Sequence, residues 1–230
     1  MMRDYRCIAI IPVRKGSRRL PNKNILPFGQ DNLLTHKIRQ LKLVQEIDDV
    51  LVSSDSLEML NMARHLGCLT HERSEEYSDE KTRSFGEVVE HIALQTPKNS
   101  ILLWTPCVCP LVDDKDFSQA LEIYQHFVLE LKAYDSVVST KIFQEYLWNA
   151  DYPINYQIGC GHIPSQKLER WNVIINGFCI SDRDVMIENK YFFGKKPRFV
   201  PISKDKAIDI DDEIDYRIAL ALASPPPPTK

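Results

Sequence analysis

The N-terminal part of the chain constrains the fold most, because an apolar run of strand length ends there in a strongly basic loop. The run reads IAIIP at residues 8–12, and no acidic residue follows until Asp31. The loop carries the cations Arg14, Lys15, Arg18, Arg19 and Lys23. Cations this close repel one another, so we expect the loop to bind an anion. Gly16 allows a close backbone approach and Ser17 adds a hydroxyl donor, which favours a polyphosphate ligand.

A solvated basic surface is the alternative interpretation of this loop. Two observations favour anion binding instead. The loop directly follows a strand of buried type, and open α/β sheets place their ligand crevices at such strand ends. Pro12 and Pro21 also restrict the backbone around the cations. The G-x-x-x-x-G-K-[ST] spacing is absent, so the loop is not a Walker A motif.

Apolar periodicity along the rest of the chain predicts alternating helices and strands. Helical spacing predicts helices over 33–44, 57–66, 85–94 and 114–131, and short apolar runs predict strands at 50–52, 101–104 and 136–139. This order predicts an α/β fold with a Rossmann-like, mostly parallel sheet and helices on both faces. We expect a single domain over residues 1–223, closed by a helix at 214–223, and a disordered proline-rich tail at 224–230.

The composition is typical of a globular protein and argues against nucleic-acid or membrane partners. The chain has 230 residues, of which 43% are hydrophobic and 27% charged, with a formal net charge of −3. A negative net charge disfavours non-specific nucleic-acid binding, and no apolar run approaches the ~20 residues of a membrane span. The N-terminus lacks a secretory apolar segment, so we expect a cytoplasmic protein whose six cysteines are free thiols.

A second motif, at residues 207–215, is rich in carboxylates. If it is a strand, alternation puts Asp209 and Asp211 on the same face. Two adjacent carboxylates are costly unless a cation lies between them, and such oxygen ligands suit Mg²⁺ bound together with substrate phosphates. The alternative is a helix start, with Asp211 or Asp212 as the N-cap and acids in the first turn. That alternative explains Asp212, Glu213 and Asp215 but not Asp209.

The basic loop resembles the signature I-P-A-R-x-x-S-K/R-x-L/I-P-x-K-N of the CTP-dependent sugar-acid cytidylyltransferases. These are the acylneuraminate (sialic acid) cytidylyltransferases and the relatives that activate Kdo and other nonulosonic acids. The matching positions are Pro12, Arg14, Ser17, Arg18, Leu20, Pro21, Lys23 and Asn24. The acidic segment resembles the family's I-D-I-D-T-x-x-D. The resemblance implies a Rossmann-like nucleotidyltransferase fold, CTP binding by the loop with Gly16 included, and Mg²⁺ on Asp209 and Asp211.

Residues 72–84 resemble the family segment R-P-x-x-L-A-x-D-x-A-x-S, which holds the cytosine and its ribose. Arg73 and Ser84 match in register, while Asp79 or Glu80 stands near the family's aspartate and the charged run 81–83 replaces small residues. The resemblance implies that Arg73 and Ser84 bind CTP. A charged surface loop leading into the helix at 85–94 is the alternative for this segment.

The stretch after the strand at 101–104 resembles the family's L-L-Q-P-T-S-P-L only loosely. Pro110 and Leu111 match, Trp104 or Thr105 stands near the family's glutamine, and Cys109 replaces a serine. Further on, Asn176 and Gly177 match the family's N-G-A-x-Y strand, where the glycine would permit close ligand approach. The resemblance implies that Thr105, Cys109 and Asn176 contact the sugar acid.

Periodicity is lost over residues 141–172, where many aromatic side chains occur. In the resembled family this region leaves the main body and packs on a second subunit, so we expect a small dimerisation excursion and a homodimer. A packed loop within one subunit would have the same composition.

The function that these motifs predict is transfer of CMP from CTP to the anomeric hydroxyl of a 2-keto-3-deoxy sugar acid, releasing pyrophosphate. Arg14 and Lys23 would stabilise the triphosphate, and Asp211 would hold the catalytic Mg²⁺ with Asp209. Two alternatives remain open. One is a nucleotidyltransferase with another acceptor, such as Kdo, a phosphonate or a sugar phosphate. The other is a non-catalytic nucleotide-binding protein of the same fold.

Overall fold

A computed structural model describes residues 4–17, 19–78 and 82–223 of the chain. Arg18, residues 79–81 of the expected base-binding segment and the expected tail at 224–230 lie outside the described residues.

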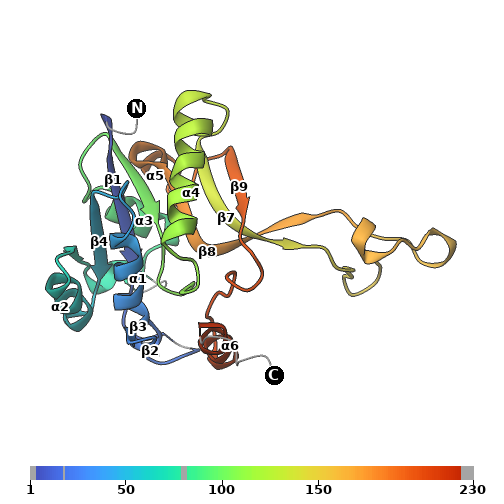
Figure 1. Cartoon of the computed structure of the whole chain (residues 1–230), viewed down its shortest axis with the longest axis horizontal. Helices are drawn as coiled ribbons and strands as arrows, with labels where there is room; N and C mark the ends of the chain where they lie inside the picture. Colours follow the sequence, from blue (N-terminus) through green and yellow to red (C-terminus); the bar gives the residue numbers. More distant parts are fainter. Residues whose placement is uncertain (1–3, 18, 79–81, 224–230) are drawn as a thin grey trace, which may run out of the picture.

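A seven-stranded sheet forms the centre of the molecule (Figure 1). Its strands lie in the order β5 (Leu69–Glu72), β4 (Asp49–Ser54), β1 (Arg6–Pro12), β6 (Ser100–Trp104), β8 (Trp171–Asp182), β7 (Ser136–Phe143) and β9 (Pro197–Pro201). The first four strands are parallel, β8 is antiparallel to both β6 and β7, and β9 is parallel to β7. The predicted mostly parallel, Rossmann-like sheet is therefore confirmed. A separate two-stranded ribbon joins β2 (Pro27–Phe28) to β3 (Asp31–Asn32).

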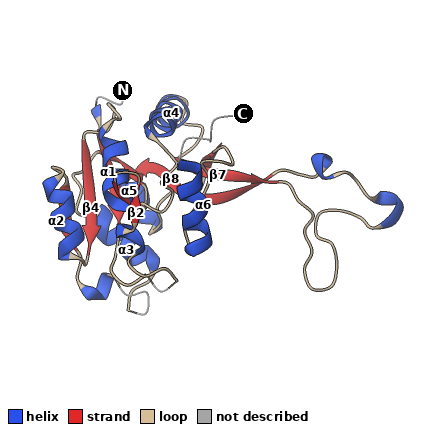
Figure 2. Ribbon diagram, turned by 60° about the horizontal axis from the view of Figure 1, so that its bottom comes forward, coloured by secondary structure: helices blue, strands red, loops and turns tan. Residues whose placement is uncertain are grey.

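Helices cover both faces of this sheet (Figures 1 and 2). One face packs against α1 (Leu33–Lys42), α2 (Leu57–His65), α4 (Asp114–Tyr124) and α6 (Glu213–Ala223), and the other against α3 (Phe85–Ala93) and α5 (Arg183–Asn189). The alternation of strand side chains determines the two cores. In β1, Ala9 and Ile11 face the first group of helices, whereas Ile8 and Ile10 face the second.

The starts of the helices follow from capping residues in the sequence. Asn32, Ser84 and Asp113 each cap a helix in a reciprocal capping box with a side chain three residues on. Such caps contribute about 1 kcal/mol each, because they pair backbone N–H groups that the helix itself leaves free. The helix predicted over 114–131 is divided: α4 ends at Tyr124 and a π-helical stretch, η4 (Gln125–Glu130), continues it.

Short 3-10 turns occur in the loops, at η2 (Lys23–Ile25), η3 (Glu75–Tyr77), η5 (Gly159–Gly161) and η6 (Ser165–Lys167). None of the helices in the described ranges has the length and the apolar character that crossing a membrane requires.

Strands β7 and β8 continue beyond the sheet as a two-stranded ribbon that carries an irregular arm. The ribbon pairs Thr140–Phe143 with Trp171–Ile174, after a register shift between Val138 and Thr140. The arm, residues 144–170, projects away from the body of the molecule (Figures 1 and 2). Its apolar side chains include Tyr152 and Ile158, which are 61% and 68% exposed.

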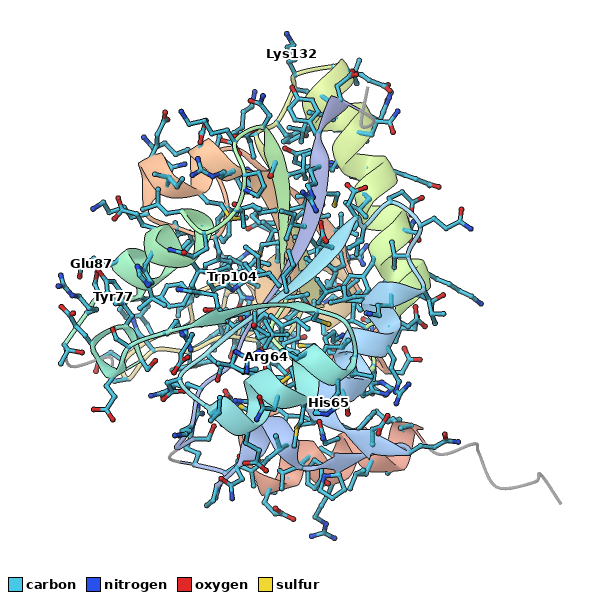
Figure 3. All side chains as sticks on the ribbon, turned by 90° about the vertical axis from the view of Figure 1, so that its left-hand side faces the viewer. Arg64, His65, Tyr77, Glu87, Trp104 and Lys132 are labelled. Atoms are coloured by element: carbon cyan, nitrogen blue, oxygen red, sulfur yellow. The ribbon has the colours of Figure 1, made fainter. Side chains whose placement is uncertain are left out.

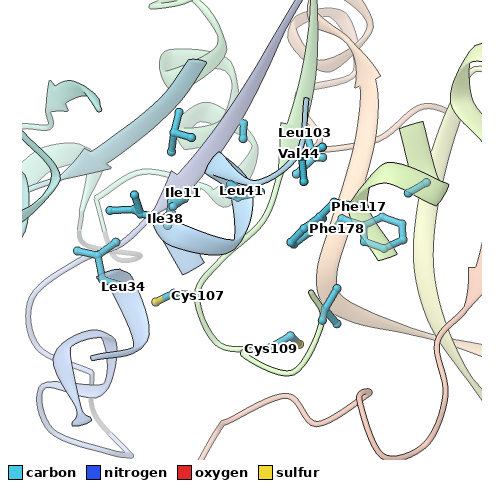
Figure 4. Close-up of a cluster of buried hydrophobic side chains, with 14 of the residues drawn as sticks. Ile11, Leu34, Ile38, Leu41, Val44, Leu103, Cys107, Cys109, Phe117 and Phe178 are labelled. Carbon is cyan, nitrogen blue, oxygen red and sulfur yellow. The ribbon is translucent and has the colours of Figure 1, made fainter. Parts of the chain in front are cut away.

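The larger core extends from the sheet into the loop that follows β6. Cys107 and Cys109 of this loop belong to the same buried cluster as Leu34 and Ile38 of α1 (Figure 4). Phe117 of α4 and Phe178 of β8 close the cluster, with ring centroids 6.0 Å apart. The loop after β6 is therefore part of the core and not a surface excursion.

Candidate functional site

A cavity of about 320 Å³ opens at the carboxyl ends of β1 and β6, where open α/β sheets place their ligands. Four regions of the chain contribute side chains to its lining. They are the basic loop with Pro12, Val13, Arg14, Ser17, Arg19, Lys23 and Asn24, the segment with Arg73, Tyr77, Ser78, Arg83, Phe85 and Val88, the end of β6 with Trp104, Pro106 and Val108, and Asn176 of β8.

The basic loop is held in shape by hydrogen bonds to its own backbone and to neighbouring segments. Asn24 Nδ2 donates to the carbonyl of Arg14 at 3.0 Å, and the backbone N–H of Lys15 donates to Asp55 Oδ1 at 2.9 Å. Gly16 has φ 71°, in the left-handed region that favours glycine, and it does not line the cavity. Arg14, Ser17, Lys23 and Asn24 do line it, so most of the predicted phosphate-binding residues are together.

Arg73 lies beneath the basic loop as a buried cation that is only partly paired. Its residue is 6% exposed, Nη2 donates to the carbonyl of Val13 at 2.5 Å, and Nε has no hydrogen-bond partner among the described residues. The pKa of Arg73 is lowered to about 10, mainly by burial; the charge of Asp55 opposes this shift and that of Arg14 adds to it. Two guanidinium groups facing one cavity are stabilised by an anion between them.

Ser84, the other predicted base-binding residue, does not line the cavity. Its Oγ accepts from the backbone N–H of Glu87 at 3.3 Å and its own N–H donates to Glu87 Oε2 at 2.9 Å. Ser84 is thus the N-cap of α3, and its predicted contact with CTP stays a prediction.

One wall of the cavity is aromatic, and no sequence pattern predicted it. Tyr77 stacks on His91 with ring centroids 3.8 Å apart, and Arg83 lies 5.3 Å from the centroid of Tyr77. Phe85 meets Trp104 edge to face at 6.3 Å. Figure 3 shows Tyr77 and Glu87 at the edge of the molecule and Trp104 further in. The ring contacts join residues of different elements, Tyr77 of η3 with His91 of α3 and Phe85 of α3 with Trp104 of β6, so no pattern within one element indicated them.

Two of the three predicted sugar-contacting residues are buried behind the cavity wall. Thr105 Oγ1 donates to the carbonyl of Gly177 at 2.7 Å, and Cys109 is fully buried, with its pKa raised well above the usual value by burial. The third, Asn176 of β8, lines the cavity. Pro106 and Val108, from the loop that carries Thr105 and Cys109, line it as well. A Cβ at Gly177 would lie 2.9 Å from Ser139 Oγ, so this glycine serves close strand packing.

The acidic segment is not a strand, so the prediction of strand alternation for Asp209 and Asp211 is wrong. Strand β9 ends at Pro201, and a turn follows in which the N–H of Ala207 donates to the carbonyl of Ser203 at 2.9 Å. The irregular stretch that follows is attached to the loop after β6, since Ile210 N donates to Val108 O at 2.9 Å.

The two carboxylates of this segment have different surroundings. Asp209 Oδ2 accepts from Asn176 Nδ2 at 2.8 Å, while its buried Oδ1 has no partner among the described residues. Asp211 Oδ1 lies 2.9 Å from Arg19 Nη2 and 3.5 Å from Lys23 Nζ. Arg19, one of the five cations of the basic loop, also lines the cavity, although it is not among the positions that match the family signature.

The capping alternative holds for the residues it was proposed to explain. Asp212 Oδ1 accepts from the N–H groups of Ile214 and Asp215 at 2.8 and 3.1 Å, at the start of α6. Asp215 Oδ2 in turn accepts from the N–H of Asp211 at 3.0 Å. The side chains of Asp209 and Asp211 take no part in this cap.

The chemistry of this carboxylate pair suits Mg²⁺. Burial raises the pKa of Asp209, hydrogen bonds from Asn176 oppose this, and the charge of Asp211 raises it further. A buried, unpartnered carboxylate oxygen beside a second carboxylate is stabilised by a cation. No group of three or more His, Cys, Asp or Glu side chains is placed for metal binding in the described part of the chain. Two protein carboxylates completed by substrate phosphates are a usual Mg²⁺ arrangement.

The family model and the curated relatives that match this chain agree on one protein family. A family model described as "Cytidylyltransferase" matches residues 8–146. The chain is 26% identical over 229 residues to an N-acylneuraminate cytidylyltransferase of Escherichia coli O18:K1:H7, covering 94% of this chain and 51% of that protein. It is 23% identical over 235 residues to a CMP-N,N'-diacetyllegionaminic acid synthase of Legionella pneumophila, covering 93% and 94% of the two chains.

Among solved structures, the fold is similar to that of a CMP:2-keto-3-deoxy-manno-octonic acid synthetase complexed with CTP. The TM-score is 0.67 at 14% identity, covering 94% of this chain and 98% of the other. The chain spans about half the length of the E. coli relative, with 51% of that protein covered. Because the family model matches well over half of the sequence, this chain belongs to the cytidylyltransferase family.

Proposed function

We propose that the protein transfers CMP from CTP to the anomeric hydroxyl of a 2-keto-3-deoxy sugar acid of the nonulosonic, sialic acid-like class, releasing pyrophosphate. The observation that carries this proposal is the contact between the two predicted motifs. Arg19 Nη2 of the basic loop lies 2.9 Å from Asp211 Oδ1, although the two residues are 192 positions apart. Arg19 and Lys23 line the cavity, and Asp211, which does not line it, lies within ion-pair distance of both. This contact supports a site in which cations that bind phosphate lie beside carboxylates that bind a metal ion, as transfer of a nucleotidyl group requires.

In this proposal the basic loop holds the triphosphate. Arg14, Ser17 and Lys23 line the cavity with donors for phosphate oxygens, and Arg73 adds a buried guanidinium with an unpaired Nε. The acceptor oxygen forms a bond to the α-phosphorus while the bond from that phosphorus to pyrophosphate breaks and the acceptor hydroxyl loses its proton. Arg14 and Lys23 stabilise the negative charge that moves onto pyrophosphate.

We also propose Asp209 and Asp211 as the protein ligands of Mg²⁺. When bound, the ion supplies a Lewis acid that stabilises charge on the reacting phosphate. The chain's own part is to hold the carboxylates in place. Asn176 orients Asp209 through a 2.8 Å hydrogen bond, and Lys23 Nζ donates to the carbonyl of Ile210, between the two aspartates, at 2.7 Å.

A homodimer formed through the arm is part of the same proposal. Exposed aromatic and aliphatic side chains on a projecting segment favour burial against another subunit. Trp148, Tyr152 and Ile158 of the arm are 50%, 61% and 68% exposed. We place the reaction in the cytoplasm, where CTP is available.

The test is pyrophosphate release from CTP and Mg²⁺ with a panel of nonulosonic acids and Kdo, with ATP, GTP and UTP as controls. Release that needs CTP and one nonulosonic acid is the expected result. Release with Kdo instead would correct the acceptor but keep the reaction. Absence of both release and CTP binding would overturn the proposed function.

A further inference from the structure

Helix α1 contains a fully buried lysine that the proposed mechanism does not use. Lys37 is 0% exposed, and its Nζ donates to the carbonyls of Cys109 at 3.0 Å and Val112 at 2.8 Å. The same Nζ lies 4.8 Å from the ring centroid of Phe117. Burying an ammonium group is costly unless hydrogen bonds replace its water. An apolar side chain could fill the same space without this cost. The presence of a lysine therefore indicates that the N–H donors of Nζ have a structural role.

The role of these donors is to pair backbone carbonyls of the loop after β6. Two neighbours of Lys37 on the same helix face bind one further carbonyl of this loop, that of Pro110, through His36 Nε2 at 3.2 Å and Gln40 Nε2 at 2.9 Å. Carbonyls in a buried loop have no strand partner and need donors from elsewhere. Helix α1 thus supplies the donors that fix residues 109–112.

The loop held in this way contacts both halves of the candidate site. On one side, Val108 O accepts from the N–H of Ile210, which lies between Asp209 and Asp211. On the other side, Cys107 Sγ donates to Asn24 Oδ1 at 3.3 Å, and Asn24 Nδ2 donates to the carbonyl of Arg14 at 3.0 Å.

We propose that Lys37 is a positioning residue, which fixes the distance between the basic loop and the acidic segment by clamping the loop that connects them. It touches neither nucleotide nor metal and acts only through the backbone of residues 107–112. The inference rests on the proposed function for its effect on turnover, whereas the clamp itself is a property of the fold. Small errors in the placement of reacting groups cost large factors in rate, so a clamp of this kind matters for catalysis.

The clamp is tested with Lys37→Met, which keeps the length and apolar stem but removes the donors. The matched control is Lys42→Met on the same helix, because Lys42 is exposed and its Nζ binds the carbonyl of Leu66, away from the loop. Hydrogen exchange of the Ile210 amide reports on one contact of the loop. Thiol labelling of Cys107 and Cys109 reports on the loop itself, and buried Cys7 and Cys179 report on global opening.

We expect Lys37→Met to speed exchange at Ile210 and labelling of Cys107 and Cys109 by about tenfold or more, while Cys7 and Cys179 stay protected. Lys42→Met should match the wild type. Unchanged exchange at Ile210 in a folded Lys37→Met protein would overturn the clamp. If Lys37→Met does not fold, Lys37→Gln keeps an N–H donor and is expected to show intermediate protection; wild-type protection in that variant would overturn the clamp as well.

The effect on catalysis is a separate readout. We expect Lys37→Met to lower kcat about tenfold with less than a twofold change in KM for CTP, and Lys37→Gln to recover part of the loss. Normal kcat together with faster exchange would overturn the positioning role. If the wild-type protein releases no pyrophosphate with any acceptor, the proposed function fails, and the exchange and labelling results still decide the clamp.

Discussion

The basic loop and the loop after β6 both line one cavity, yet they are held in place by different means. In the basic loop, the groups that line the cavity are side chains of the loop itself, such as Arg14 and Lys23. In the loop after β6, Thr105 and Cys109 are buried, and the backbone is held by Lys37 from α1 and joined to Ile210 near the other end of the chain. The basic loop thus depends on its local sequence, whereas the loop after β6 depends on packing between segments that are distant in the sequence.

Because of this difference, we expect mutations in the two loops to change different properties of the protein. Substitutions on the basic side should change CTP binding and turnover with little effect on folding. Substitutions behind the loop after β6 should instead change stability, because their side chains pair buried polar groups.

The largest effect is expected at the carboxylates. Asp211→Asn should lower turnover about 100-fold or more, because it removes the charge of one proposed Mg²⁺ ligand at a site where negative phosphate must bind. Pyrophosphate release under saturating CTP measures the change. Asp212→Asn is the matched control, since asparagine retains the N-cap of α6, and it should keep near wild-type turnover. Equal turnover in Asp211→Asn and wild type would remove the metal role.

The next effect is on the donor nucleotide. Arg14→Ala should weaken CTP binding roughly 10- to 100-fold, because one charge-assisted contact to phosphate is lost while Arg73 and Lys23 still line the cavity. Calorimetric titration with CTP measures the dissociation constant. Arg39→Ala on α1, which removes a surface ion pair to Asp31 of β3, serves as the control and should bind CTP normally. An unaltered dissociation constant in Arg14→Ala would contradict the phosphate-binding role.

The basic loop could be predicted from the sequence better than the loop after β6, because its features are local. The strand at residues 8–12, the helix periodicities and the spacing of cations could be recognised because each resides in one short stretch. The aromatic wall of Tyr77 and Trp104, and the buried Lys37, could not. Their positions depend on which segments the sheet brings together, and no local pattern encodes that.

The acidic segment shows an intermediate case. Its residues were identified, and Asp212 and Asp215 cap α6 as the alternative interpretation expected. The predicted strand conformation was wrong because alternating apolar residues, here Ile208 and Ile210, also occur in an irregular segment, where Ile210 is buried in the core and Ile208 only partly. A pattern of two apolar positions does not distinguish these cases.

A stability effect of moderate size is expected on the packed side. Thr105→Val should lower the free energy of unfolding by about 1–3 kcal/mol, because the buried carbonyl of Gly177 loses its donor. Urea unfolding measures it. Thr70→Val on the sheet edge is the control, with an expected change within about 0.5 kcal/mol. A stability loss no larger than that of the control would show that the Thr105 hydrogen bond does not hold this side of the cavity.

The smallest effect concerns pH. Burial lowers the pKa of His71 to about 4, with the charges of His91 and Arg73 acting in the same direction. On acidification, His71 therefore becomes protonated near pH 6.5 in the unfolded chain but only near pH 4 in the folded protein. The contribution of His71 to the free energy of unfolding is present above pH 6.5 and is lost as the pH falls toward 4.

His71→Gln should flatten part of this acid dependence, since glutamine can still bond Ser53 Oγ but does not titrate. Urea unfolding of both proteins at pH 7.5 and 5 gives the comparison. The same loss of stability in the variant as in the wild type would assign the acid sensitivity to other groups.

The most direct test of the account is a competition among nucleotides. The wild-type protein is incubated with CTP, ATP, GTP and UTP together, Mg²⁺ and a mixture of nonulosonic acids, and nucleotidyl esters are identified by mass spectrometry. We expect a CMP ester of one acid, formed with one equivalent of pyrophosphate and about 100-fold or more slowly with Asp211→Asn. An ester of another nucleotide, or the same CMP ester with Asp211→Asn at wild-type rate, would contradict it.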